Sequence, residues 1–255
     1  MSIDWNNTAA AIWRPRRGAL RPVQQLDDIS LDQLLGIDPQ KQKLVENTER
    51  FLNRLPANNA LLWGSRGTGK SSLIKALLNA YFERGLRVVE VDKDDLVDLP
   101  EIVDDIRELP QRFIIFCDDL SFAQDENTYK HMKSVLDGSI ERPPQNIIIY
   151  ATSNRRHLLS ESVTDNHVTE IVANELHYGD AVEEQLSLAD RFGLWLSFYP
   201  FNWHQYFALV DSYFANFDGD RKALHEAARQ FALLRASHSG RTAKQFYLSY
   251  ADSKD

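Results

Sequence analysis

One stretch, ALLWGSRGTGKSSLIKALLNAYF at residues 60–82, constrains the fold of this chain more than any other. Its apolar beginning is typical of a buried strand, and its last residues carry apolar side chains at helical spacing. The residues between, GSRGTGKS at 64–71, match the pattern G-x-x-x-x-G-K-[ST]. Glycines let the backbone curl so that successive N–H groups point at one anion, and a helix N-terminus adds a favourable dipole. The stretch therefore predicts a strand, a phosphate-binding loop and a helix.

Two side chains of this loop have distinct predicted roles. Lys70 would reach the β- and γ-phosphates of a nucleotide, and Ser71 would ligate Mg²⁺. A glycine-rich turn can match the pattern by accident, but the strand before it and the helix after it argue against that interpretation. The predicted nucleotide-binding residues of the loop are Gly64, Ser65, Arg66, Gly67, Thr68, Gly69, Lys70, Ser71 and Ser72.

Short apolar runs alternate with helical patterns along the chain. These runs are continuously apolar rather than alternating, which is typical of parallel strands whose sheet is covered on both faces. The rhythm predicts an α/β fold with five parallel strands, at residues 59–63, 86–92, 112–119, 146–154 and 193–200.

The pattern changes after residue 200. Three segments with apolar residues at helical spacing follow, opened by Asn202, by the turn at 218–220 and by Ser239. We interpret them as a small helical lid. The predicted organisation is an N-terminal arm at 1–30, a P-loop αβα nucleotide-binding domain at 31–200 and the lid at 201–255.

Polar side chains follow two of the predicted strands. Asp118 and Asp119 end the strand at 112–119, where an open parallel sheet presents its ligand crevice. We expect Asp118 to orient the Mg²⁺ shell and Asp119 to polarise the attacking water, although Asp119 stands where many P-loop ATPases carry the longer Glu. Thr152, Ser153 and Asn154 end the strand at 146–154, and such a side chain can fix a water opposite the γ-phosphate. The alternative for the acidic pair is a turn that caps the next helix.

Two arginines complete the predicted site. Arg191 lies just before the fifth predicted strand, and Arg241 lies at the start of the last lid helix. A lone arginine usually forms a surface ion pair. The functional interpretation is that Arg191 reaches the γ-phosphate of a neighbouring subunit while Arg241 closes the lid over its own nucleotide, because cationic charge there stabilises the transition state.

Composition excludes several classes of protein. A net charge of −8 and a pI near 5.4 over 255 residues argue against a broad nucleic-acid-binding surface. Only a local strip in the arm stays open, formed by Arg14, Arg16, Arg17 and Arg21. No apolar run approaches the roughly 18 residues of a membrane span, and the single cysteine, Cys117, predicts a reducing cytoplasm. His157, His167 and His177 are too widely spaced for a zinc motif.

The order of these motifs resembles a bacterial family of AAA+ P-loop ATPases that is catalogued as a domain of unknown function. The resemblance covers roughly residues 25–250. More distantly, the double aspartate is similar to helicase loaders and transposition ATPases, and the DRF at 190–192 is similar to the replication initiator. The blocks that carry the family resemblance are GSRGTGKSS, FCDDLSF, YATSNRRHLL, LSLADRFGLWLSFYPF and SGRTAKQF.

The resemblance implies a three-layer αβα fold whose five strands, numbered along the chain, lie in the order 5-1-4-3-2. It also implies roles for Asn154 as sensor 1, Arg191 as arginine finger and Arg241 as sensor 2. Ile37 lies in a segment, LLGID at 34–38, that looks like the AAA+ entry loop contacting adenine. Segment 155–185 is expected to be a loop or hairpin on the nucleotide face.

The expected function is that of an AAA+ subunit that binds and hydrolyses Mg-ATP in an assembly, to remodel or load an unknown protein client. One alternative is a nucleotide-dependent switch or loader with little intrinsic hydrolysis, because Asp119 has a shorter reach than Glu. A small-molecule kinase is weaker, because Arg241 stands alone on the predicted lid. A GTPase is disfavoured, because no NKxD motif follows the strand at 146–154.

Overall fold

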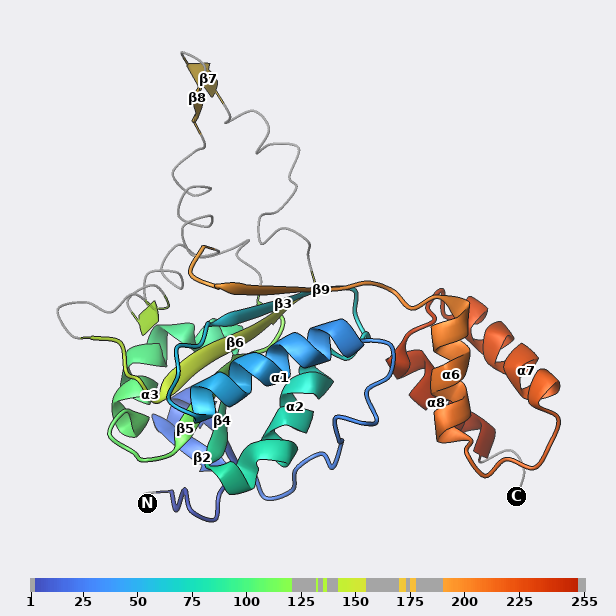
Figure 1. Ribbon diagram of the computed structural model, residues 1–255, viewed down its shortest axis with the longest axis horizontal. Coiled ribbons are helices and arrows are strands. Elements are labelled where there is room, and N and C mark those ends of the chain that lie inside the picture. The colour runs from blue at the N-terminus through green and yellow to red at the C-terminus, as the bar shows by residue number, and fades with distance from the viewer. Residues whose placement is uncertain are drawn as a thin grey trace.

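The computed structural model describes residues 3–120, 132, 135–136, 142–154, 170–172, 175–177 and 190–251 (Figure 1). Segment 155–185 lies outside the described residues except for two short antiparallel strands, β7 (Glu170–Val172) and β8 (Glu175–His177). The expectations for His157 and His167, and for the side chain of His177, therefore also lie outside them.

Five parallel strands form the centre of the fold: β3 (Ala60–Gly64), β4 (Leu86–Val91), β5 (Arg112–Cys117), β6 (Ile147–Ser153) and β9 (Leu194–Phe198). They lie in the order β9-β3-β6-β5-β4, and each neighbouring pair is parallel. This is the order 5-1-4-3-2 that the family resemblance implied for these five strands.

In the part of the chain that the structure describes, the sheet nevertheless has seven strands, so the predicted number of five is wrong. Strand β1 (Ala10–Arg14) pairs in parallel with β4, and β2 (Ala19–Pro22) pairs antiparallel with β1. Both lie within the residues predicted as an arm. Arginines and prolines surround these strands, but Ala10, Ala11 and Trp13 of β1 are buried. The short 3₁₀ helix η1 (Pro15–Arg17) and the left-handed Gly18, with φ of 54°, join the two strands.

Helices cover both faces of the sheet. Leu62 of β3 faces a core that includes α1 (Asp38–Leu52) and α2 (Lys70–Tyr81). Leu61 faces a second core that includes α3 (Leu99–Ile106). Successive side chains of a strand point to opposite faces, so the continuously apolar strands supply both cores, as expected for a three-layer αβα fold. Two more 3₁₀ helices, η2 (Phe82–Arg84) and η3 (Lys93–Asp98), flank β4.

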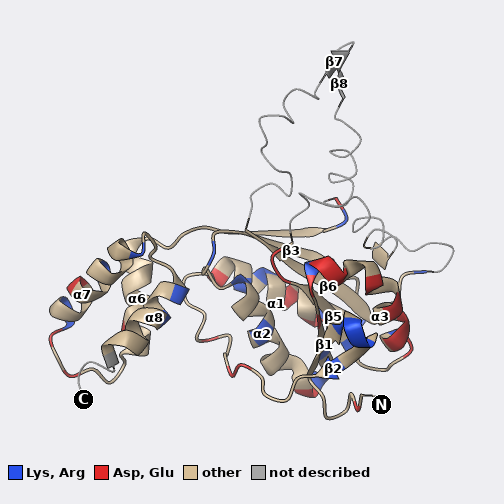
Figure 2. Ribbon diagram, turned by 180° about the vertical axis from the view of Figure 1, so that it is seen from behind, with Lys and Arg blue, Asp and Glu red and all other residues tan. Residues whose placement is uncertain are grey.

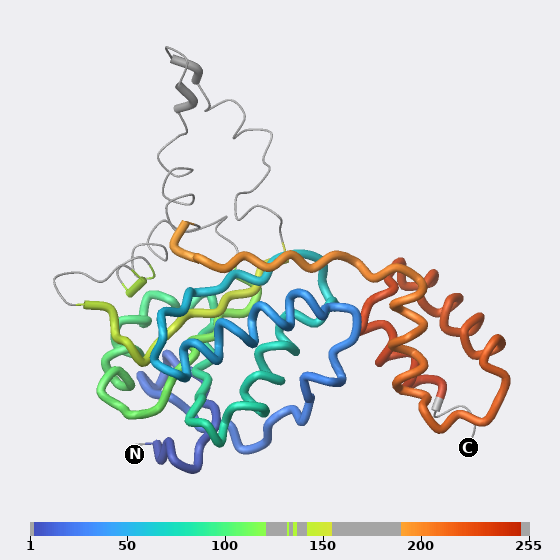
Figure 3. The backbone as a smooth tube through the Cα atoms, viewed as in Figure 1, coloured from blue at the N-terminus to red at the C-terminus, as the bar shows by residue number. Residues whose placement is uncertain are grey.

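The three lid helices form a bundle to one side of the sheet, and the chain runs from β9 directly into them (Figures 1 and 3). Asn202 caps α6 (Trp203–Tyr213) in a reciprocal capping box with Gln205. Asp220 caps α7 (Arg221–Leu234), and α8 (Gly240–Ala251) follows Ser239. Within the described part of the chain, no helix combines the length and the apolarity needed to cross a membrane.

The role of β1 can be tested through Trp13. Its ring is buried, and its Nε1 donates a hydrogen bond of 2.8 Å to Asp98 Oδ2. We expect Trp13→Ala to lower the free energy of unfolding by about 3–5 kcal/mol, because it removes a large buried ring and leaves a cavity. Denaturant unfolding measures the change. Arg16→Ala, on the exposed turn beside it, should change it by no more than about 0.5 kcal/mol. Equal effects of the two substitutions would mean that β1 is a dispensable arm.

Candidate functional site

The loop between β3 and α2 is held against the neighbouring strand β9. Ser65 N–H donates a hydrogen bond of 3.0 Å to the carbonyl oxygen of Phe198. Gly64 has φ of 128°, and a Cβ there would lie 2.0 Å from that same oxygen. Only glycine allows this close approach together with this backbone conformation. The motif's first glycine is therefore required by the packing of the loop on β9.

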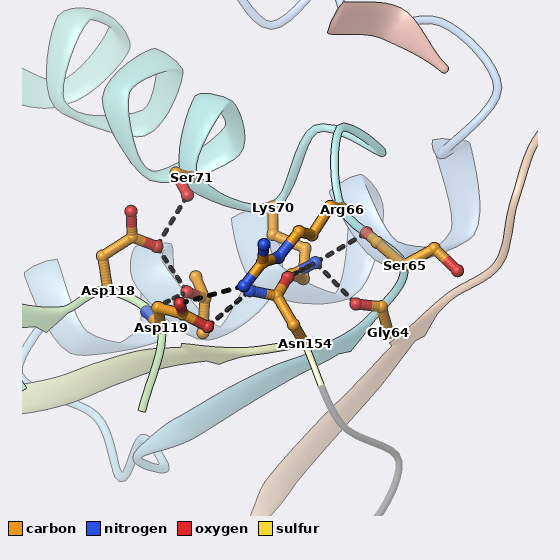
Figure 4. A network of polar contacts seen from close by, with 9 residues as sticks. Gly64, Ser65, Arg66, Lys70, Ser71, Asp118, Asp119 and Asn154 are labelled. Atoms are coloured by element: carbon orange, nitrogen blue, oxygen red, sulfur yellow. Dashed lines mark hydrogen bonds and ion pairs between the residues drawn. The ribbon is translucent and has the colours of Figure 1, made fainter. Parts of the chain in front are cut away.

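Lys70, the lysine of the loop motif, is buried. Its Nζ donates to the carbonyl oxygens of Gly64 and Ser65, at 2.8 and 2.7 Å, and to Asn154 Oδ1 at 3.2 Å (Figure 4). Burial lowers the pKa of Lys70 to about 8, while Asp118 and Asp119 act in the opposite direction. The ammonium is hydrogen-bonded to neutral carbonyl oxygens of the loop. A negatively charged phosphate oxygen would be a stronger hydrogen-bond partner for it.

Asp118 connects three elements at the carboxyl edge of the sheet. Its Oδ1 accepts a hydrogen bond of 2.8 Å from Ser71 Oγ on α2 and another from Thr152 Oγ1 on β6. A hydroxyl and a carboxylate are hard oxygen donors of the kind that Mg²⁺ prefers. Ser71 and Asp118, the two predicted metal ligands, are thus brought together by the fold.

Asp119 has an unusual backbone conformation, with φ of 55°. Its N–H donates to Thr152 Oγ1 at 2.9 Å, which supports the conformation. Its Oδ1 accepts a hydrogen bond from Asn154 Nδ2, and its Oδ2 lies 3.6 Å from a terminal nitrogen of Arg66. Asn154 therefore joins Asp119 to Lys70 (Figure 4). The predicted sensor, base and loop lysine form one connected network.

The first turn of α2 can receive an anion. Gly69 precedes the helix and has φ of 98°. All residues of this turn are described, and no side chain at the N-cap accepts a hydrogen bond from its N–H groups. The first N–H groups of any α-helix have no partner within the helix, and its N-terminus carries partial positive charge. With Lys70 beside it, this donor set fits the phosphates of a nucleotide.

A cavity of about 1040 Å³ opens in front of this turn, and both the sheet domain and the lid line it. Ile37 borders it and approaches Gly69, where a Cβ would lie 3.4 Å from Ile37 Cδ1. From the lid, Arg241 lines the cavity, and Gly240 N–H donates a hydrogen bond of 3.0 Å to the carbonyl oxygen of Gly67. Ile37 and Arg241, from distant parts of the sequence, therefore both reach the predicted site.

Arg191 does not join this cluster and does not line the cavity. It precedes the amino end of β9, whereas Phe198, at the carboxyl end, lies opposite Gly64. At about 3.3 Å per residue, that separation is on the order of 20 Å. Because β9 pairs directly with β3, this separation runs along the strand rather than across the sheet.

Sequence reasoning missed several cavity residues. Glu90 lies one residue before the end of β4, in an otherwise apolar strand, and burial, followed by the charge of Asp118, raises the pKa of its carboxyl. Lys75 follows Ser71 by one helical turn, which is a usable signal because residues at i and i+4 share a helix face. Phe201, Tyr213 and Lys244 come from the lid or its entry, whose position the sequence did not define.

The lowered pKa of Lys70 predicts a pH effect on stability. Between about 8 and 10.5, the unfolded chain still binds a proton that native Lys70 has released. The free energy of unfolding should therefore rise with pH across this range, by up to about 1.4 kcal/mol per pH unit from this group. Denaturant unfolding at several pH values should show the rise relative to Lys70→Met, which has no titrating group. Parallel curves for the two proteins would contradict the burial of the charged form.

Comparison with known proteins agrees with this geometry. The model of the family described as "Protein of unknown function (DUF815)" matches residues 6–254. The ATP-dependent Clp protease ATP-binding subunit ClpL of Staphylococcus aureus (strain USA300) is 23% identical over an alignment of 194 residues, and the match covers 66% of this chain and 27% of ClpL. This chain thus spans about a quarter of that relative.

Solved structures of two RuvB mutants from Thermotoga maritima also match, each with a TM-score of 0.52 and 14% identity. The matches cover 85% of this chain and 70% or 71% of RuvB, and at this identity they show the fold alone. The chain therefore belongs to the DUF815 family, and it is a member with the fold and phosphate-binding loop of the AAA+ P-loop ATPases.

Proposed function

We propose that this protein binds Mg-ATP in the cavity and hydrolyses it, as a subunit of an assembly that remodels or loads a protein client. The observation that carries the proposal is the convergence of Lys70, Ser71, Asp118, Asp119 and Asn154 at one edge of the sheet, in hydrogen-bond contact with one another.

In this proposal the phosphates bind across the first turn of α2, where Lys70 exchanges its carbonyl partners for phosphate oxygens. Ile37 and neighbouring apolar side chains receive the base. A Mg²⁺ ion held by Ser71 and Asp118 would neutralise charge on the phosphates. The ordinary donors of a P-loop are thus all present in this chain.

Hydrolysis needs a group that accepts a proton from the attacking water. Asp119 is the proposed base, and Asn154 orients it. Arg241 adds positive charge from the lid of the same subunit. Arg191 would supply a second charge to the site of a neighbouring subunit, since the length of β9 separates it from its own loop.

A nucleotide-dependent switch or loader with slow hydrolysis is the second candidate. It is supported by the contacts of Asp119, whose two carboxylate oxygens both face other protein groups. These contacts leave fewer acceptor positions on the carboxylate for the attacking water.

Nucleic acid is a weaker proposal for a partner. Arg14, Arg16 and Arg17 lie at the turn between β1 and β2, and Lys or Arg and Asp or Glu are interspersed over the described ribbon in Figure 2. Arg14 also lies close enough to Asp95 and Glu90 to lower the pKa of both carboxyls, although other causes leave both pKa values raised. Acidic neighbours reduce the attraction of this turn for a phosphate backbone.

The assignment of Asp118 to the metal predicts a split between two affinities. Asp118→Asn keeps a similar shape but loses the charge that holds Mg²⁺. We expect it to weaken Mg-ATP binding by about 10-fold or more and metal-free ATP binding by less than about 3-fold. Calorimetry with and without Mg²⁺ measures both. Glu101→Gln, an exposed carboxylate of α3, is the control and should change neither. Equal losses with and without Mg²⁺ would make Asp118 a structural residue.

The separation of Arg191 from its own loop predicts activity that depends on assembly. ATP turnover per subunit should rise with protein concentration. Arg191→Ala keeps an intact loop and Lys70→Ala keeps an intact Arg191, so mixing the two inactive variants should restore part of the activity at shared interfaces. Steady-state phosphate release measures it. If the mixture stays inactive where the wild type assembles and turns over ATP, the arginine does not act in trans.

A further inference from the structure

The two oxygens of Asp119 have partners of different kinds. Oδ1 accepts a hydrogen bond from Asn154, which also accepts one from buried Lys70. Oδ2 faces Arg66, a residue of the phosphate-binding loop, at 3.6 Å. The first contact is with Asn154, which directly follows β6 of the central sheet. The second joins Arg66 and Asp119, which both line the cavity (Figure 4).

The contact with Arg66 is the weaker of the two. The Arg66 side chain is 72% exposed and that of Asp119 is 48% exposed. Exposed ion pairs contribute at most about 1 kcal/mol, because water competes for both charges. When one oxygen of Asp119 has to be freed for water, Oδ2 is therefore the oxygen that can be freed.

Arg66 also lies where a stronger partner would bind. Arg66 lines the same cavity as Lys70, and the loop backbone that joins the two residues leads into the first turn of α2. A guanidinium group binds phosphate through two parallel hydrogen bonds, which are stronger than a single contact with an exposed carboxylate. A terminal phosphate in the cavity would therefore compete with Asp119 for Arg66.

The backbone favours such an exchange. Asp119 is held in its left-handed conformation by the hydrogen bond to Thr152, so its carboxylate does not depend on Arg66 for its position. The Arg66 side chain is long and exposed, so its guanidinium can move while the loop backbone keeps its hydrogen bonds to Phe198 and Gly240.

We propose that Arg66 is a positioning residue that holds Oδ2 of Asp119 until a nucleoside triphosphate binds, and that it then moves to the terminal phosphate and leaves Oδ2 free for water. The inference rests on the proposed function, because it assumes that the cavity binds ATP. This exchange would make Asp119 available as a base only when the phosphate to be cleaved is bound. A nucleoside diphosphate would leave the ion pair between Arg66 and Asp119 in place.

A double-mutant cycle on nucleotide binding tests the exchange. The four proteins are wild type, Arg66→Gln, Asp119→Asn and the double variant, and calorimetry measures their affinities for Mg-ATP and Mg-ADP. Arg66→Gln should weaken Mg-ATP by about 10-fold and Mg-ADP by no more than about 2-fold. Arg66→Lys should recover part of the loss, because it keeps the charge.

The sign of the coupling between the two positions is decisive. If Arg66 leaves Asp119 when ATP binds, the substitution Asp119→Asn removes a competitor for Arg66. Asp119→Asn should then tighten ATP binding more in the wild-type background than in the Arg66→Gln background. If Arg66 stays on Asp119, it screens the carboxylate from the phosphate, so the tightening should be larger in Arg66→Gln. The second result, or an equal effect in both backgrounds, would overturn the inference.

Two controls separate this result from the other assignments. Arg84 forms an exposed ion pair with Glu49 at 3.5 Å, and neither residue lines the cavity. Arg84→Gln breaks this ion pair and should leave the affinities for Mg-ATP and Mg-ADP unchanged. Wild type should bind Mg-ATP and Lys70→Ala should not. If wild type also fails to bind ATP, the proposed function fails. If ATP binds and the coupling has the opposite sign, the role of Arg66 alone is rejected.

Discussion

The register of β3 between its two parallel neighbours fixes the distances of the whole site. On one side Gly64 lies opposite Phe198 of β9, and on the other Trp63 lies opposite Ser153 of β6. The loop therefore begins beside the strand end that carries Asn154, and Lys70 can reach across to it. A slip of one residue would turn every side chain of β3 to the other face, and the two cores beneath would not form.

Charge is balanced closely at this edge of the sheet. The buried ammonium of Lys70 is solvated by neutral loop oxygens, and this arrangement lowers its pKa because burial disfavours the charged form. The two aspartates make their short contacts with hydroxyl, amide and guanidinium groups, and they attract the lysine electrostatically without a hydrogen bond to it. In the proposed function, a phosphate would give Lys70 a negatively charged partner in direct contact, in place of the neutral loop oxygens.

What the sequence could predict depends on how local each feature is. The loop is encoded in consecutive residues, so its strand, turn and helix were all predicted. The order of the strands was not encoded in any single motif and came from the resemblance to AAA+ proteins. Strands β1 and β2 were missed because the arginines and prolines around them are typical of a tail, and their pairing with β4 is long-range. The burial of Lys70 and the ion pair of Arg66 depend on carbonyl and side-chain positions that no motif records.

The lid is tied to the same loop at the residue next to Arg66. Gly67 accepts a hydrogen bond from Gly240, and a Cβ at Gly67 would lie 2.7 Å from Ser239 Oγ and 3.2 Å from Arg241 Cβ. No side chain can be placed there without moving α8 outward, so this glycine sets how closely the lid approaches the phosphate-binding loop. Arg66 and Gly67 are consecutive, and the peptide between them therefore links the acidic end of β5 to the first turn of α8. The lid and the acidic end of β5 therefore contact neighbouring residues of one loop.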